Sequence, residues 1–128
     1  MGRLDGKRVL VSQADDYMGP ITLEVFAEEG AEVIADSSDL TDPSRAAALI
    51  EETGHIDVLV ANLAASANLG IAAAEMPDDI WQTMFDVMVH PLHRLTKAVL
   101  PQMVERQKGN FGVWQCDGRE RHGRYYRL

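Results

Sequence analysis

The sequence predicts an α/β fold of the Rossmann-like, three-layer α/β/α type with a parallel sheet. Short apolar runs rich in valine occupy residues 7–11, 32–35 and 56–60, and such runs are typical of strands buried on both faces. Segments with helical spacing separate these runs along the chain. Strands that alternate with helices at this spacing form βαβ units with right-handed crossovers.

The first two helices are predicted from their end signals. A helix over residues 21–29 opens after Gly19 and Pro20, and Gly30 ends it. The stretch Thr41-Asp42-Pro43 offers a capping side chain followed by proline, so a second helix is expected to start there and continue through residues 46–52.

A long third helical region follows a loop of small residues. Pro77-Asp78-Asp79 marks its start, and apolar residues recur at helical spacing from Ile80 to Gln107. Proline cannot donate the main-chain hydrogen bond of a helix, so Pro91 and Pro101 are expected to kink or divide this region.

Composition bounds the function classes. With 128 residues the chain suits one domain, and its net charge of −8 argues against binding to nucleic acid or to anionic membranes. No stretch approaches the roughly 20 apolar residues of a membrane span, and the first residues lack a signal-peptide core, so a cytoplasmic location is expected. Cys116 is the single cysteine, and the pair His90 and His93 lacks a third ligand nearby, so no metal site is predicted.

Charge and composition change near Gly109. Residues 1–108 carry eight Lys/Arg and eighteen Asp/Glu, a net charge of −10, whereas residues 109–128 carry four Arg and two acids, a net charge of +2. The last twenty residues also hold the cysteine and two of the three tyrosines. We therefore divide the chain into a half-domain over residues 1–108 and a tail over residues 109–128.

The turn SQADDYMG, residues 12–19, is the first candidate site. It follows the first predicted strand, and in a nucleotide-binding sheet the pyrophosphate lies at this position against the N-terminus of the first helix. Asp36 ends the next strand, seventeen positions after Gly19, where a carboxylate could accept hydrogen bonds from a ribose. The alternative is that Asp36 belongs to a solvated turn or a helix cap.

Five segments in this order resemble the N-terminal half of the short-chain dehydrogenase/reductase superfamily: LDGKRVLV, GAEVIAD, DLTDP, HIDVLVAN and AVLPQM. The resemblance covers residues 3–108. It implies that Asp39 and Leu40 flank the adenine of NAD or NADP, and that Asn62 and Ala64 lie near this cofactor after the third strand.

One strand-helix unit of the family is missing between Asp36 and Asp39. The loss of an edge strand need not destroy the sheet. The resemblance also implies that the fold is truncated after about the family's fifth strand.

The glycine-rich turn of the family departs most from its pattern. The family writes TGxxxGxG, and this chain has Ser12, Gln13, Tyr17 and Gly19 at the four fixed places. A phenol ring at the second glycine would occupy the volume of the pyrophosphate. The neighbouring pair Asp15-Asp16 adds charge of the wrong sign for a phosphate.

The halohydrin dehalogenases, a branch of the same superfamily, resemble the chain at this turn. They use no nucleotide, their turn reads T-x4-F/Y-x-G, and a halide rests near the aromatic ring. Ser12 to Gly19 reads S-x4-Y-x-G, and VMVHPLHRL is also similar to that branch. The resemblance implies a cofactor-free lyase that forms epoxides, with a halide near Tyr17. The alternatives are an NAD(P)-dependent oxidoreductase of small alcohols or carbonyls, and an inert assembly fragment in which Tyr17 merely closes the turn.

The catalytic segment of the family has no counterpart in this sequence. That segment holds a serine, then a tyrosine with lysine four positions later, or arginine in the dehalogenases. Tyr125 and Tyr126 have no such partner. We therefore predict no catalytic residue in the chain, an aberrant or frame-shifted end from about residue 112, and no activity of the chain alone. The family resemblance implies a small-molecule substrate and a homo-oligomer.

Overall fold

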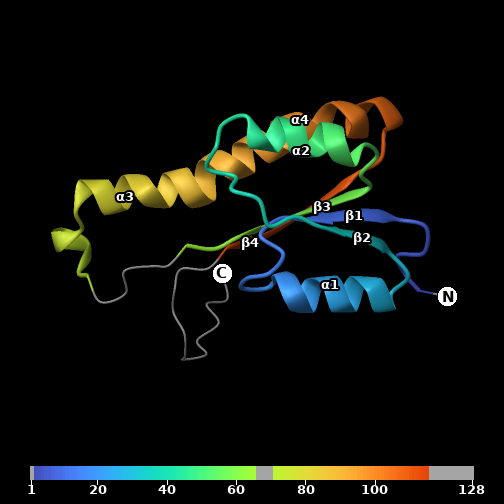
Figure 1. Cartoon of the computed structure of the whole chain (residues 1–128), viewed down its shortest axis with the longest axis horizontal. Coiled ribbons are helices and arrows are strands. Elements are labelled where there is room, and N and C mark those ends of the chain that lie inside the picture. Colours follow the sequence, from blue (N-terminus) through green and yellow to red (C-terminus); the bar gives the residue numbers. More distant parts are fainter. Residues whose placement is uncertain (1, 66–70, 116–128) are drawn as a thin grey trace.

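The computed structural model describes residues 2–65 and 71–115 and contains a four-stranded parallel sheet. The strands are β1 (Arg8–Val11), β2 (Glu32–Ala35), β3 (Val58–Leu63) and β4 (Asn110–Gln115), and their order in the sheet is β2-β1-β3-β4 (Figure 1). Val9 lies opposite Val33 on one side and Val58 on the other, so β1 is a central strand. The predicted α/β fold with a parallel sheet is confirmed.

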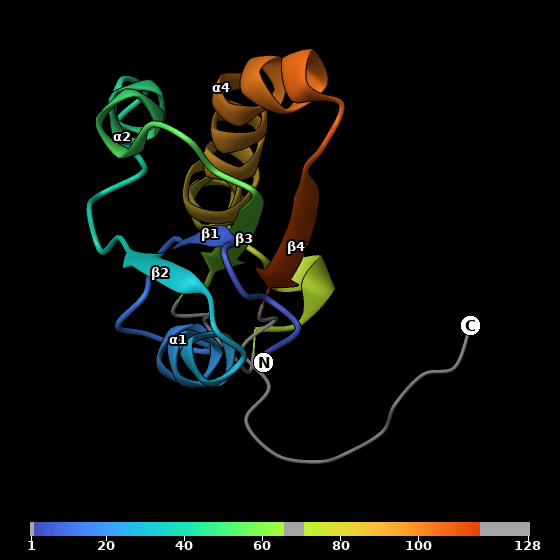
Figure 2. The ribbon, with the colours of Figure 1, turned by 90° about the vertical axis from the view of Figure 1, so that its right-hand side faces the viewer.

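Helices cover both faces of the sheet. Helix α1 (Gly19–Glu28) lies on one face, and α2 (Arg45–Thr53) and α4 (His90–Arg106) lie on the other (Figure 2). The chain runs from β1 through α1 to the edge strand β2, and then from β2 through α2 on the opposite face to β3. The winding direction therefore changes between β1 and β3. In sheets of this kind ligands bind where the winding direction changes, beyond the carboxyl ends of the strands.

The core has two parts, one on each face of the sheet. Alternate residues of a strand point to opposite faces. Val9, Val11 and Val60 accordingly pack with residues of α1 such as Phe26, whereas Leu10 belongs to the larger part on the opposite face. The larger part also contains the following buried residues of β3, α2 and α4: Leu59, Leu63, Leu49, Ile50, Leu95, Val99 and Met103.

The long helical region is divided at one of its two prolines. Helix α3 (Asp78–Met84) leads into a π-helical segment, η2 (Phe85–Val89), and α4 begins at His90. Pro91 has no amide to give to the carbonyl of Val87, and the preceding His90 amide bonds to Phe85 O, five residues back. Pro101 lies inside α4 and does not end it, so only the division at Pro91 is confirmed.

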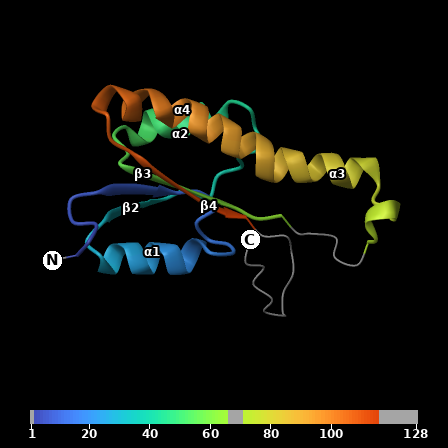
Figure 3. The same ribbon diagram turned by 180° about the vertical axis from the view of Figure 1, so that it is seen from behind.

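The segments before and after β3 differ in detail from the sequence prediction. A short 3-10 helix, η1 (Ala73–Glu75), precedes α3, and α3 extends beyond the sheet (Figure 3). Helix α2 begins at Arg45, shortly after the predicted start at residues 41–43, and Asp42 Oδ1 accepts hydrogen bonds from the amide and the hydroxyl of Ser44 just before the helix. β3 runs three residues past the predicted end at Val60 and starts two residues later than Ile56.

The segment after Gly109 contributes β4. Its residues pair with β3 from Val58–Asn110 to Leu63–Gln115. Cys116 and the rest of the predicted tail, residues 116–128, lie outside the described residues. No helix in the described ranges is long and apolar enough to cross a membrane.

Substitution of Leu95 on α4 measures how much the packing of this helix against the sheet contributes to stability. We expect Leu95→Ala to lower the free energy of unfolding by about 2–5 kcal/mol, because the side chain is fully buried and its removal leaves a cavity. Leu100→Ala is the matched control on the same helix, since Leu100 is 39% exposed, and its cost should stay below about 1 kcal/mol. Urea denaturation followed by circular dichroism measures both, and equal costs would contradict the packing described here.

Candidate functional site

The turn between β1 and α1 is fastened to the end of β3 by buried polar groups. Ser12 is fully buried; its amide donates to Val60 O at 3.1 Å and its hydroxyl to Asn62 O at 3.0 Å. Asn62 is also fully buried, and its Nδ2 donates to Gln13 O at 2.8 Å and to Asp16 O at 2.9 Å. Ser12 and Asn62 therefore hold the shape of the turn.

Two residues of this turn have left-handed backbone conformations. Gln13 has φ 45° and Tyr17 has φ 49°, and these are the places where the family turn has its first two glycines. Such a conformation costs a residue with a side chain roughly 1–2 kcal/mol. The turn therefore keeps the backbone shape that glycine would give, but carries side chains there.

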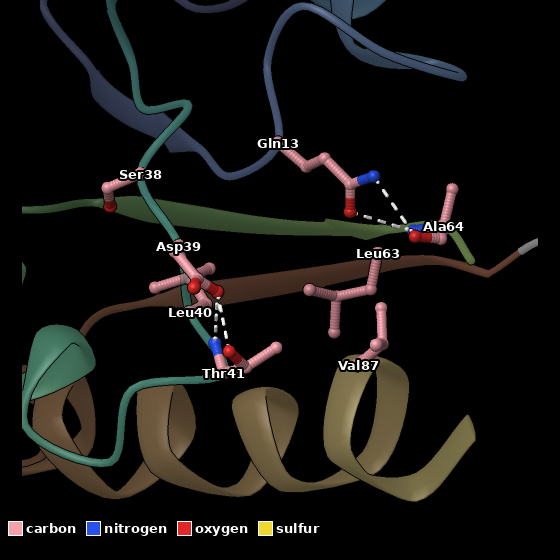
Figure 4. Close-up of a pocket in the computed structure, with 8 residues that line it drawn as sticks. All are labelled: Gln13, Ser38, Asp39, Leu40, Thr41, Leu63, Ala64 and Val87. Atoms are coloured by element: carbon pink, nitrogen blue, oxygen red, sulfur yellow. Dashed lines mark hydrogen bonds between the residues drawn. The ribbon is translucent and has the colours of Figure 1, made fainter. Parts of the chain in front are cut away.

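Gln13 compensates for this strain with its side-chain amide. Its Nε2 donates to Ala64 O at 3.0 Å, and the amide of Ala64 donates to Gln13 Oε1 at 2.9 Å (Figure 4). Each such bond contributes about 1 kcal/mol net, so the pair offsets the backbone strain. Nε2 also donates to Asp16 Oδ2 at 3.2 Å. We call the paired bonds to Ala64 the Gln13 bridge.

Gly19, the third place of the motif, is required by close packing. It is buried, its amide donates to Asp16 O at 2.8 Å, and a Cβ on it would lie 2.3 Å from Ala14 O. No side chain fits there unless the turn moves.

Tyr17 occupies the second glycine place of the turn. Its residue surface is 43% exposed, and its amide donates to Asp16 Oδ1 at 2.7 Å. It does not line either of the two cavities described below.

Asp36, at the end of β2, has most of its carboxylate engaged inside the protein. It is 8% exposed and accepts hydrogen bonds from the amide and hydroxyl of Ser38. Arg45 lies 3.7 Å from its Oδ1. The main-chain carbonyl of Asp36 accepts the amide of Ala14 at 2.9 Å, which joins β2 to the turn.

Asp39 carries a negative charge at the mouth of the site. Its Oδ1 accepts the hydroxyl of Thr41 at 2.7 Å and the amide of Thr41 at 2.9 Å. These bonds, the hydroxyl first, lower the pKa of Asp39 below its ordinary value. Asp39 therefore stays ionised at neutral pH.

Two cavities flank the Gln13 bridge. The smaller, of about 180 Å³, lies toward Asp39, and the larger, of about 320 Å³, lies toward Asp16. Gln13, Ala64 and Val87 line both cavities, and among the described residues no lysine, arginine or histidine lines either. The other lining residues are Ser38, Leu40, Thr41 and Leu63 for the smaller, and Ala65, Ile80, Thr83 and Met84 for the larger.

The structure thus brings Ala64 and Asp39 to the cleft, buries Ser12, Asn62 and Gly19 beneath it, and leaves Tyr17 outside both cavities. The sequence analysis did not predict that α3 and the π-helical segment line the larger cavity. Pro91, four residues after Val87, was the sequence signal for the π-helical segment. His90 lies 3.8 Å from Asp86, and the described residues contain no cluster of three side chains able to hold a metal.

A parallel sheet with a turn of this shape at its switch point defines the nucleotide-binding class of α/β folds. A family model described as short chain dehydrogenase matches residues 4–111. The chain therefore belongs to the short-chain dehydrogenase family.

Individual relatives agree with this assignment. Dehydrogenase/reductase SDR family member 6 of Danio rerio is 30% identical, in a match that covers 86% of this chain and 52% of the relative. Oxidoreductase UcpA of Escherichia coli strain K12 is 32% identical, covering 85% of this chain and 51% of the relative. The chain spans about half the length of the curated relatives it matches.

Solved structures show the same fold. The crystal structure of gox2181 superposes with a TM-score of 0.76 at 22% identity, covering 87% of this chain and 54% of that one. A structure named "Dehalogenation enzyme" gives a TM-score of 0.75 at 25% identity, covering 88% of this chain and 55% of that one.

Substitution of Gly19 tests the packing of the turn. We expect Gly19→Ala to lower the free energy of unfolding by at least about 2 kcal/mol, because the added Cβ meets main-chain atoms of Ala14. Gly112→Ala is the control, since a Cβ there meets only Val60 Cγ2 at 3.9 Å. Thermal and urea denaturation measure the difference, and a Gly19 variant as stable as the Gly112 variant would refute the close approach.

The ionisation of Asp39 can be tested through Thr41. We expect Thr41→Val to raise the pKa of Asp39 toward its ordinary value, because the variant removes the hydroxyl donor and keeps the amide. Carboxyl-carbon NMR titration measures this pKa. Ser44→Ala, which removes the equivalent donor to Asp42, is the control and should leave the pKa of Asp39 nearly unchanged.

Proposed function

We propose that this chain is the first half of a short-chain dehydrogenase-family enzyme that works without a dinucleotide, of the halohydrin dehalogenase type. The observation that carries the proposal is the state of the turn after β1. Where a dinucleotide needs open main-chain amides, the amides of Ala14, Asp16, Tyr17 and Gly19 already donate hydrogen bonds within the protein.

The charges around the turn also support a site without pyrophosphate. Asp16 and Asp39 line the cavities, Asp15 precedes Asp16 in the sequence, and no basic side chain of residues 2–65 and 71–115 lines either cavity. A pyrophosphate would be repelled there. A single halide carries less charge, and Asp16 is partly balanced by the donors Gln13 and Tyr17.

The reaction that the resemblance implies needs a catalytic tyrosine and an arginine in addition to the turn at residues 12–19. A tyrosine base assisted by an arginine takes the hydroxyl proton of a halohydrin, the oxygen attacks the neighbouring carbon, and the halide leaves with the electron pair of its bond, which yields an epoxide. Neither the tyrosine nor its arginine is present in the sequence at the required spacing. The role of this chain is to form one wall of the substrate pocket, and we propose that it is inactive alone.

Seven residues make up the proposed ligand-binding region, in two groups. Tyr17, Asp39 and Ala64 lie where a ligand can reach them. The others, Ser12, Gly19, Asp36 and Asn62, act by holding the turn and the end of β2 in place. The halide would lie near Tyr17, as in the resembled branch.

An NAD(P)-dependent oxidoreductase of small alcohols or carbonyls is the second candidate. It is favoured by the backbone of the turn, which keeps left-handed conformations at both glycine places, and by the smaller cavity beside Asp39 and Leu40, where the resemblance places adenine. The names of the two relatives cited above, a dehydrogenase/reductase and an oxidoreductase, point the same way.

The proposal includes assembly and location. Exposed apolar residues on η2 and α4, namely Val89, Leu100 and Val104, support association of the chain with itself through this helical face.

The single cysteine supports a reducing, cytoplasmic location.

Calorimetric titration of the full chain with NADH, NADPH and bromide tests the function. We expect no heat from either nucleotide, with dissociation constants weaker than about 1 mM, and saturable heat from bromide. A nitrate solution of the same ionic strength is the control for general salt effects, because nitrate is not a halide. Micromolar binding of NADH or NADPH would overturn the cofactor-free function in favour of the second candidate.

A further inference from the structure

We infer that Gln13, by bridging the ends of β1 and β3, is the specificity-determining residue that closes this cleft to a dinucleotide and confines it to small ligands. The inference rests on the proposed function and deepens it. It also reassigns the excluding role, which the sequence pattern gave to Tyr17, to the side chain at the first glycine place.

The geometry of the bridge carries the inference. Gln13 binds both the carbonyl and the amide of Ala64, at 3.0 and 2.9 Å, so its side chain is fixed at both ends of its amide. Figure 4 shows this amide extended from the end of β1 toward Ala64, across the switch point of the sheet. A ligand that runs from Asp39 to the start of α1 must cross that line.

The cavities lie on the two sides of this bridge. Gln13, Ala64 and Val87 line both, so the two cavities adjoin at the bridge and the π-helical segment, and we take the bridge as the partition between them. The smaller cavity, of about 180 Å³, is below the range of about 300–1,000 Å³ typical of ligand pockets, and the larger, of about 320 Å³, is just inside it. Only the larger cavity has the volume of a small-molecule pocket, and it lies at the lower end of the range.

The lining of the larger cavity indicates which small molecules it takes. Ile80, Met84 and Val87 give it an apolar wall, and Asp16 gives it a hydrogen-bond acceptor with negative charge. A compact molecule with an apolar body and a hydroxyl group matches this surface. Its hydroxyl donates to the carboxylate.

Tyr17 does not have the position needed for the same role. It lines neither cavity and is 43% exposed. The two hydrogen bonds of the Gln13 bridge do not involve its ring.

The test compares binding of ADP-ribose, the part of a dinucleotide that lies against this half of the fold, to the full chain and its variants. We expect wild type and Tyr17→Gly to bind equally weakly, within about twofold, and Gln13→Gly to bind at least about tenfold more tightly. Gln13→Ala, which also removes the bridge, is a second variant and should show the same direction. Circular dichroism confirms that each variant is folded.

Gln107→Gly is the matched control. Gln107 is the same residue type in the same left-handed conformation, with φ 55°, but at the end of α4. Its replacement relieves the same kind of backbone strain, so it should leave ADP-ribose binding unchanged.

The outcomes separate the inference from the proposed function. If wild type is weak and folded Gln13→Gly and Gln13→Ala remain equally weak, or if Tyr17→Gly alone gains affinity, the role of Gln13 is refuted and the cofactor-free function stands. If wild type already binds ADP-ribose at micromolar concentration, the cofactor-free function fails together with the partition.

Discussion

The side chain of Asn62 is the interaction on which the site depends. It is fully buried at the end of β3 and donates to two carbonyls of the turn, those of Gln13 and Asp16. A buried donor must find acceptors, and here the acceptors belong to the loop that would otherwise be free to open. Because Asn62 fixes these carbonyls, Gln13 and Tyr17 are held in left-handed conformations that they would not adopt alone.

As a consequence, the backbone of the turn keeps the family's conformation while its side chains differ from those of the family. The backbone follows the path that the family builds from glycine, while the side chain of Gln13 fills the space that glycine leaves open. Departures from a motif can therefore preserve its geometry and remove its ligand. Membership of the family and the proposed site without a dinucleotide are compatible for this reason.

The sequence predicted the α/β fold, but it did not predict the contacts of the candidate site. Valine-rich runs and glycine or proline at helix ends predict β1, β2 and α1 because these signals are local. The path of β3 beyond Val60 depends on pairing with β4, fifty residues away, which no local pattern encodes. The Gln13 bridge likewise joins residues far apart in sequence, and a glutamine at a glycine place indicates only that something has changed.

A second group of polar contacts lies at the opposite end of the sheet from the cleft. There Arg106 donates to Ile56 O at 2.6 Å, and Gln102 accepts the amide of Ile56 at 2.9 Å, so the end of α4 is tied to the segment entering β3. Burial opposes the ionisation of Asp57 nearby, but the Arg8 amide and His55 outweigh it and lower its pKa. A group with a lowered pKa adds stability above its ordinary pKa and loses it as the pH falls through the lowered value. These contacts do not involve the turn after β1, so that turn can change its ligand while α4 and the sheet stay joined.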